Sequence, residues 1–219
     1  MDTEQKPTAP QASAPDSEVA DATETVQAQW KSWAISAGLA AAVFLGVTLY
    51  RYNARSNEEK ASRMLGEGRT VQHFQTIMTE YPGTGAAPLA MLQVAKGQFD
   101  SGDYVMAMST YASFSTRYPK HPMLPVADLG RVHCMEAMGQ TTEALTAYTA
   151  FASANTGSYL TPMAVFGKAR CLEQLRRLDE AKAVYEDFMA ANPKSPWTSE
   201  VEQALTLLSR EMRKPVVKL

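Results

Sequence analysis

The sequence predicts an all-α protein: an α-solenoid of about 3.5 helical hairpins behind one transmembrane helix. The first observation behind this prediction is an internal repeat of 37 residues that aligns without gaps. A strict period of this length is typical of stacked units that bury their apolar faces against one another. The second is an apolar run near the N-terminus. The repeated residues include Pro88, Pro125 and Pro162, then Ala107, Ala144 and Ala181, then Tyr111, Tyr148 and Tyr185, and finally Phe114, Phe151 and Phe188.

Each copy of the repeat predicts two helices joined by a short turn. The first two joints, Ser101-Gly102-Asp103 and Gly139-Gln140-Thr141, contain turn-forming residues, whereas the third, Arg176-Arg177, lacks glycine. A proline near the start of each first helix is tolerated because it falls in the first turn. The expected first helices are 86–100, 123–137 and 160–174, and the second helices are 103–117, 140–154 and 177–191.

The repeat pattern extends beyond the three full copies, and we expect the domain to cover residues 70–212. One period before the first copy, Phe74, Ile77 and Tyr81-Pro82 match Tyr111, Phe114 and Tyr118-Pro119, which predicts a preceding half-unit. A final helix is expected near 197–212. Terminal units need a polar outer face, and four polar residues suit that role: Glu200, Glu202, Gln203 and Arg210.

Residues 30–52 are predicted to be a transmembrane helix. Residues 33–50 carry no charge, Lys31 and Arg51 bracket them, and aromatic residues stand at both edges. A signal peptide and a buried core helix are the alternatives. The long acidic segment before the run and the lack of a small-x-small site after Tyr50 argue against a signal peptide. The run is both long and apolar on all sides, which argues against a core helix.

Small residues recur every four positions within this run, at Ala34, Gly38, Ala42 and Gly46. This spacing places them on one helix face, where a second transmembrane helix could approach closely. That helix would belong to a second copy or to a partner. Small residues fill much of the segment, so chance explains the spacing equally well.

The remaining segments are short. Residues 1–29 contain six acids and one lysine and are predicted to be a disordered acidic tail. Residues 53–69 are polar and favour helix, which predicts a juxtamembrane helix. Residues 213–219 form a short tail.

Composition and motifs point away from catalysis and nucleic-acid binding. Residues 53–219 hold 18 Lys and Arg against 17 Asp and Glu, and nucleic-acid binding needs a basic surface. No phosphate-binding loop, nucleophile elbow or metal-spaced histidine pair is present, so no catalytic residue, metal site or cofactor is predicted. Cys134 and Cys171 are one period apart, too far for a disulfide, and are predicted to be buried.

Five basic residues on the first helices are the candidate binding residues. Lys96, His133 and Arg170 are equivalent by the repeat, and so are Arg131 and Lys168. They could form a row of hydrogen-bond donors for the acidic groups or C-terminal carboxylate of a bound peptide. The simpler alternative is an ordinary solvated helix face.

The repeat resembles the tetratricopeptide repeat. Gly102-Asp103-Tyr104, followed by Ala107, Tyr111 and Pro119, fits that family's helix–turn–helix pattern, although the period is three residues longer than the usual 34. The endings Tyr81-Pro82, Tyr118-Pro119 and Asn192-Pro193 are similar to the variant in bacterial envelope proteins of the BamD and Tol-associated type. The middle copy departs from this pattern, with Asn155-Thr156-Gly157 at its end.

The layout of tail, span and repeats resembles the single-pass ancillary subunit of the bacterial Sec translocon. That resemblance implies an inner-membrane protein whose repeat domain lies in the periplasm and engages chaperones and emerging substrates. The charges indicate the opposite orientation, because basic residues after the span outnumber Lys31 before it. Large domains translocate largely regardless of such charges, so we expect the periplasmic orientation that the resemblance implies, with the cytoplasmic orientation as the alternative. The basic residues after the span are Arg51, Arg55, Lys60, Arg63 and Arg69.

We therefore expect a non-enzymatic, membrane-anchored scaffold that binds protein partners at the inner membrane, in protein secretion or envelope biogenesis. The span would raise the effective concentration of the domain near those partners. The alternative is a structural subunit that assembles, with itself or with a partner, through the small-residue face of the span.

Overall fold

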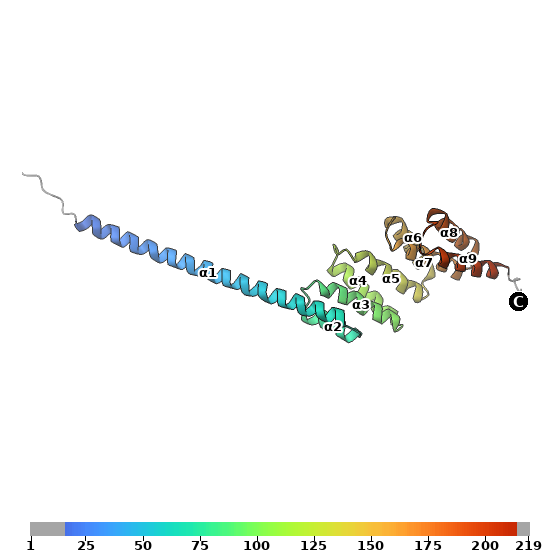
Figure 1. The fold of residues 1–219 in the computed structure, drawn as a ribbon, viewed down its shortest axis with the longest axis horizontal. Coiled ribbons are helices and arrows are strands. Elements are labelled where there is room, and N and C mark those ends of the chain that lie inside the picture. The colour runs from blue at the N-terminus through green and yellow to red at the C-terminus, as the bar shows by residue number, and fades with distance from the viewer. Residues whose placement is uncertain (1–15, 214–219) are drawn as a thin grey trace, which may run out of the picture. The chain divides into compact units, whose positions relative to one another are not determined.

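The computed structural model describes residues 16–213, and in that range it contains nine helices and no strand. The chain divides into two units, residues 1–56 and 57–219, and α1 contributes to both. The helices of the second unit follow one another in chain order from α2 to α9 (Figure 1). Their bounds are α1 Asp16–Glu67, α2 Val71–Glu80, α3 Ala86–Asp100, α4 Tyr104–Arg117, α5 Leu124–Ala137, α6 Thr141–Ala154, α7 Thr161–Gln174, α8 Leu178–Ala191 and α9 Thr198–Met212.

Helix α1 begins earlier than the sequence predicts. The backbone is helical from Asp16, so the expectation of a disordered tail is wrong for residues 16–29, and residues 1–15 lie outside the described part. That stretch is rich in Ala, Glu and Gln, which favour helix, and acids near a helix N-terminus are stabilised by the helix dipole. The predicted span and juxtamembrane helix are therefore parts of one continuous helix.

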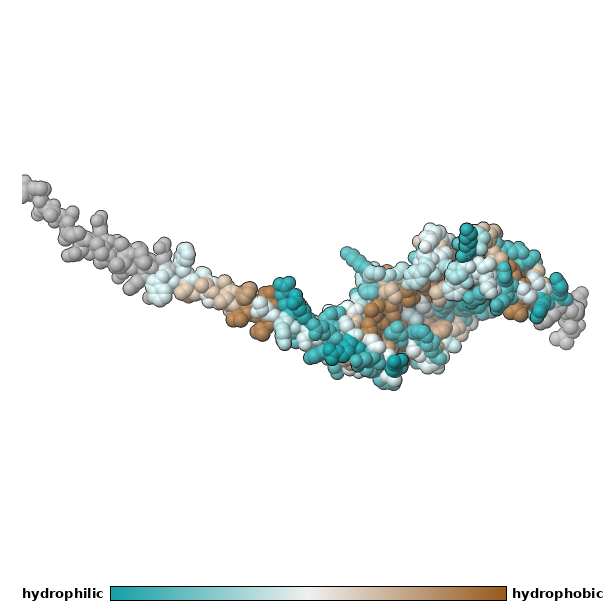
Figure 2. All heavy atoms as spheres, in the orientation of Figure 1, coloured by the Kyte–Doolittle hydropathy of each residue, from teal (hydrophilic) through white to brown (hydrophobic). Residues whose placement is uncertain are grey.

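Among the described residues, α1 is the one helix long and apolar enough to cross a membrane. Its most apolar stretch has no residue buried inside the protein. Figure 2 shows these apolar side chains as a brown band on α1, followed by polar residues. The large ones are exposed: Ile35, Leu39, Val43, Phe44, Leu45, Val47 and Leu49.

The second unit is a stack of helical hairpins, as the repeat predicts. The pairs α3/α4, α5/α6 and α7/α8 match the expected ranges to within one residue at each end. The repeated alanine of each second helix is fully buried, and the repeated tyrosine and phenylalanine are at most 8% exposed. The small alanine allows the paired helices to approach, and the aromatic rings fill the space between hairpins. The fold is therefore an all-α solenoid.

The three joints share one backbone conformation. Gly102 and Gly139 have φ of 84° and 78°, in the left-handed region that glycine adopts readily. The next amide then donates to the carbonyl five residues earlier, as from Asp103 to Gln98 at 2.9 Å. Arg176 adopts the same conformation, with φ of 60°, although it has a side chain. The third joint therefore forms the same turn without a glycine, and its backbone is strained at Arg176.

Relief of this strain is testable with two variants. Both Arg176→Gly and Arg176→Ala lose the exposed ion pair with Glu211 (2.9 Å), but only glycine relaxes the left-handed backbone. We expect Arg176→Gly to be more stable than Arg176→Ala by about 1 kcal/mol in urea denaturation followed by circular dichroism. Gly139→Ala should lose about the same amount. Equal stability of the two Arg176 variants would contradict a strained joint.

The half-unit predicted before α3 is a complete, shorter hairpin. The end of α1 supplies its first helix: Ala61 is fully buried in a cluster with Ile77, Ala86 and Ala90. Helix α2 has 10 residues where α4 has 14, a difference of about one turn. The joint accordingly falls at residues 68–70, whereas the 37-residue period would place it at 64–66. The repeat unit thus begins inside the predicted juxtamembrane helix.

Helix α9 ends the stack with a polar surface. Glu202, Thr206 and Ser209 occupy the positions at which α7 has Val165, Ala169 and Leu172. In α7 those apolar residues lie where its own second helix packs, and α9 has no second helix among the described residues. The four residues predicted to form the cap are all exposed, namely Glu200, Glu202, Gln203 and Arg210.

Candidate partner-binding surface

The five predicted basic residues lie on two faces of the stack. Positions 131 and 133 are separated by about 200° around a helix, and so are 168 and 170. Lys96 and Arg170 line cavities between successive first helices. Arg131 and Lys168 line cavities that include the second helix of their own hairpin. The expected single row of donors is therefore two rows, and no one peptide groove contains all five.

Three of the five already face carboxylates of this chain. Lys96 pairs with Asp100 one turn later, and Arg131 lies 3.9 Å from Asp128. Arg170 makes a two-pronged contact with Glu136: Nε donates to Oε1 at 2.9 Å and Nη2 to Oε2 at 2.8 Å. These pairs neutralise much of the charge that the sequence suggested was available to a ligand.

Glu136 and Arg170 belong to a polar cluster that joins three helices, here called the His133 cluster. Its members are His133 and Glu136 on α5, Tyr148 on α6 and Arg170 on α7. The Tyr148 hydroxyl donates to Glu136 Oε2 at 2.6 Å and lies 2.7 Å from His133 Nδ1. A hydroxyl has one proton, so His133 must carry its proton on Nδ1 and donate it to Tyr148.

The surroundings shift the acid–base properties of this cluster. Burial lowers the pKa of His133, the positive charge of Arg170 lowers it further, and the charge of Glu136 opposes both. Burial alone would raise the pKa of Glu136, but hydrogen bonds from Arg170 and Tyr148 and the charges of Arg170 and His133 lower it overall. Burial and the bond to Glu136 raise the pKa of Tyr148. At neutral pH the cluster therefore holds one carboxylate, one guanidinium and a neutral imidazole.

Close contacts between tyrosines and glycines hold successive hairpins together, and we did not predict them. A Cβ atom on Gly167 would lie 2.4 Å from the Tyr148 ring, and one on Gly130 would lie 2.5 Å from the Tyr111 ring. Each glycine follows its tyrosine by 19 residues, and Ala204 follows Tyr185 by the same interval. This constant spacing was the available sequence signal.

The junction between the first hairpin (the end of α1 with α2) and the second (α3/α4) lacks this contact and contains a cavity. Gln93 occupies the α3 position where α5 and α7 have glycine. Phe74, which stands at the tyrosine position of α2, lies instead against Gly68, where a Cβ atom would be 2.5 Å from its ring. A cavity of about 460 Å³ lined by both Phe74 and Gln93 lies here.

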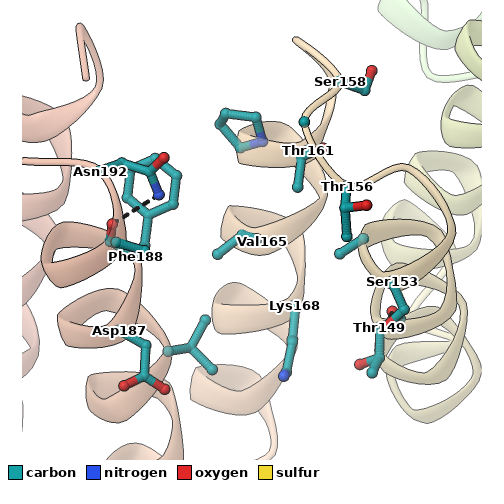
Figure 3. Close-up of a pocket in the computed structure, with 15 residues that line it drawn as sticks. Thr149, Ser153, Thr156, Ser158, Thr161, Val165, Lys168, Asp187, Phe188 and Asn192 are labelled. Atoms are coloured by element: carbon teal, nitrogen blue, oxygen red, sulfur yellow. Dashed lines mark hydrogen bonds between the residues drawn. The ribbon is translucent and has the colours of Figure 1, made fainter. Parts of the chain in front are cut away.

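A groove of about 580 Å³ lies over α7, between α6 and α8. We call it the α6–α7–α8 groove. Figure 3 shows Val165 and Lys168 on the middle helix, with Thr149 and Ser153 to one side and Asp187 and Phe188 to the other. Its apolar lining residues are Ala152, Pro162, Val165, Val184, Phe188 and Ala191, and its polar ones include Thr149, Ser153, Thr156, Ser158, Thr161 and Asn192.

A comparison with the preceding hairpin explains why the α6–α7–α8 groove extends to α6. At the equivalent place Ser115 on α4 donates to Asp128 on α5 at 3.1 Å. One period later these two residues become Ala152 and Val165, which cannot form that bond. The corresponding cavity over α5 is smaller, about 430 Å³, and has no lining residue from α4. The substitution thus removes a polar link and leaves an apolar surface.

The rim of the groove is rich in hydrogen-bond acceptors. Thr149 donates to the carbonyl of Leu145 at 2.8 Å, and Ser153 donates to that of Thr149 at 3.0 Å. Their hydroxyl protons are engaged, which leaves oxygen lone pairs directed outward. Asp187 adds a carboxylate, and Lys168 adds a cationic donor on the middle helix. The groove therefore combines an apolar floor with acceptors along its edges and one cation.

A model of the tetratricopeptide repeat-like domain matches residues 26–210. The chain belongs to this family. The match covers the predicted span as well as all the hairpins. No curated protein matches the chain in sequence.

Solved structures share the fold of this tetratricopeptide repeat-like protein. A structure of nearly identical TPR-like repeats from Podosopora anserina is 17% identical, with a TM-score of 0.55 over 74% of this chain and 88% of its own. A tetratricopeptide repeat protein from Parabacteroides merdae is 16% identical, with a TM-score of 0.52 over 72% of this chain and 60% of its own. BtubC from P. vanneervenii is 20% identical, with a TM-score of 0.50 over 74% and 67%. At such identities the similarity concerns the fold.

The repeat-like domain protein buries both of its cysteines, as predicted. Burial raises the pKa of the Cys134 and Cys171 thiols to about 11. Buried thiols of this kind are unreactive near neutral pH. Within residues 16–213 no group of three or more His, Cys, Asp or Glu residues is arranged to hold a metal ion. A fold of this family is typically a protein-interaction scaffold rather than a catalyst.

Proposed function

We propose that this protein is a membrane-anchored scaffold that holds an extended segment of a partner protein in the α6–α7–α8 groove. It would act at the bacterial inner membrane, with the repeat domain in the periplasm, in protein secretion or envelope biogenesis. The observation that carries the proposal is the groove itself, which has a volume of about 580 Å³ and lies within a fold that typically binds proteins.

The chemistry of the groove suits a polypeptide. An extended backbone presents N–H donors on both sides, which the oxygens of Thr149, Ser153 and Asp187 can accept. Small apolar side chains fit the floor around Val165. An acidic side chain of the segment would lie near Lys168. Specificity would be loose, as suits a scaffold that meets several client sequences.

The apolar stretch of α1 supports the proposed anchor. A core helix of a soluble protein would be largely buried, whereas none of this stretch is buried. The run of exposed Leu, Val, Ile and Phe side chains is of the length that a bilayer core requires. Anchoring would concentrate the repeat domain near membrane-bound partners without any new contact.

A photo-crosslinking experiment tests the groove. The crosslinker is placed at Thr156, which is exposed at the rim, or at Pro119, which is exposed at the equivalent position one period earlier. In native membranes we expect discrete protein adducts from Thr156 alone. Ala152→Arg fills the floor and should reduce these adducts about tenfold, since a charged side chain would then occupy an apolar surface. Equal adducts from both positions would contradict the groove.

Charge reversal separates the two rows of basic residues. Lys168→Glu should weaken crosslinking from Thr156, whereas Arg131→Glu, at the equivalent position of α5, should leave it unchanged. The matched pair controls for a general loss of positive charge. A uniform loss with both variants would indicate nonspecific electrostatic attraction and would overturn binding in this groove.

The orientation requires its own experiment. Protease added to intact spheroplasts should digest the repeat domain if it lies in the periplasm. Complete protection, lost only after the membrane is broken, would place it in the cytoplasm as the basic residues after the span indicate.

The alternative function is assembly through the span. Ala34, Gly38, Ala42 and Gly46 are all exposed, and a Cβ atom on either glycine meets nothing within 4 Å. This face is therefore free to receive another helix. Crosslinks between copies that disappear in Gly38→Leu/Gly46→Leu, without crosslinks from Thr156, would favour this alternative over the scaffold.

A further inference from the structure

The His133 cluster and the α6–α7–α8 groove are built on the same pair of helices. Tyr148 of α6 and Arg170 of α7 belong to the cluster, whereas Thr149 of α6 and Lys168 of α7 line the groove. The cluster connects α5, α6 and α7 through polar contacts. A change in these contacts therefore alters the spacing of two of the three helices that form the groove.

We infer that the His133 cluster is an acid-sensitive junction, at which protonation of His133 loosens α5 and α6 from α7 and so weakens binding in the α6–α7–α8 groove. The loosening follows from the cluster alone. The effect on binding rests on the proposed function. The trigger is a drop in pH below neutrality, in the range where histidine gains its second proton.

The hydrogen bonds allow one protonation state of the imidazole. Its Nδ1 donates to the Tyr148 hydroxyl, which in turn donates to Glu136. Its Nε2 is buried and has no hydrogen-bond partner among the described residues. A second proton would place an N–H donor and a positive charge at this site without an acceptor, and both are unfavourable when buried.

The charges around His133 do not offset that cost. Glu136 on its own helix is attractive, but Arg170 on α7 already occupies both oxygens of its carboxylate. Tyr148 on α6 is the remaining titratable neighbour and stays neutral. On the other helices packed against α5, Lys96 pairs with Asp100 on α3, and burial raises the pKa of Tyr111 on α4 to about 12, so that it stays neutral. Asp128, on α5 itself, accepts from Ser115 of α4.

The direction of the pH effect follows from these contacts. Burial and Arg170 hold the pKa of His133 below its ordinary value of 6.5. The unfolded chain therefore binds the proton more readily than the folded one. The stabilisation due to a neutral His133 is complete above the unfolded pKa and is lost progressively as the pH falls below it. Acid thus favours opening of the junction.

Hydrogen–deuterium exchange of the full chain in detergent tests the junction without any partner. After correction for intrinsic exchange rates, peptides of α5, α6 and α7 should lose about tenfold in protection between about pH 7.5 and pH 5.5, relative to peptides of α3. His133→Gln, which cannot be protonated, should remove this loss. His121→Gln is the control, because His121 lies outside the cluster and accepts from the Met123 amide.

Two outcomes would overturn the inference. The first is an equal loss of protection in His133→Gln and the unchanged chain. If His133→Gln folds poorly at neutral pH, His133→Phe provides the same comparison with a ring in place. The second is crosslinking from Thr156 that stays constant across this pH range while the exchange changes, which would separate the junction from the groove. Crosslinking that falls with pH in parallel with protection supports the inference.

Discussion

Replacing Arg170 by methionine is expected to lower the free energy of unfolding by about 2 kcal/mol. The Glu136 side chain is only 11% exposed, and the guanidinium supplies two of its hydrogen bonds. Without Arg170 a buried carboxylate keeps only the Tyr148 hydroxyl as a partner. The cost is below that of a fully buried pair because the Arg170 side chain is itself 46% exposed. Urea denaturation at neutral pH gives the value.

A variant of the partner residue, Glu136→Gln, shows whether Arg170→Met is destabilising because it leaves a buried charge unpaired or because it loses packing. Glu136→Gln leaves Arg170, which can turn toward water, so it should cost less than Arg170→Met. Glu136→Gln added to Arg170→Met should restore part of the stability, because it removes the unpaired carboxylate. The deficit of Arg170→Met should also shrink as the pH falls toward the ordinary pKa of a glutamate, because the variant binds a proton there. If the double variant lost as much stability as the two single variants together, Glu136 and Arg170 would not be energetically coupled, which would contradict this prediction.

The helical hairpins were predictable because the sequence repeats their packing residues at a strict interval. The alanine, tyrosine and phenylalanine of each second helix fix its buried face, and the joints fix its start. The first hairpin was not predicted as a whole, since it is about one turn shorter and so falls out of register with the period. Comparison of Phe74 and Ile77 with the later copies located its second helix, but not Ala61 in the first.

The binding surface was less predictable, for two different reasons. The sequence does contain the information that Arg131 and His133 lie on opposite faces, because residues two apart on a helix cannot share one. A single row of all five basic residues is incompatible with this helix geometry. The pairing of Arg170 with Glu136, by contrast, depends on how two hairpins pack, and their separation of 34 residues carries no local signal. The α6–α7–α8 groove and the His133 cluster could therefore be recognised only in the structure.

Gly167→Ala is expected to cost about 2 kcal/mol, although alanine favours helix more than glycine does. The added methyl would lie 2.4 to 2.7 Å from three atoms of the Tyr148 ring. The ring is fully buried, and its hydroxyl is fixed by Glu136 and His133, so it cannot move aside. The two hairpins would have to separate, and thermal or urea denaturation would measure the loss of stability.

Two controls place this cost at the junction. Gly66→Ala, in α1, meets nothing within 4 Å and should be neutral or slightly stabilising. Ala204→Gly, at the equivalent position of α9, should cost no more than about 1 kcal/mol, which is the difference in helix propensity. Alanine is the residue already present there, on the last helix of the described stack, whose backbone lies close to that of α8 alone, whereas the backbone of α7 lies close to those of α5, α6 and α8. If Gly167→Ala were as stable as Gly66→Ala, the close approach of α7 to Tyr148 would be wrong, and the His133 cluster would lose the rigid ring that positions it.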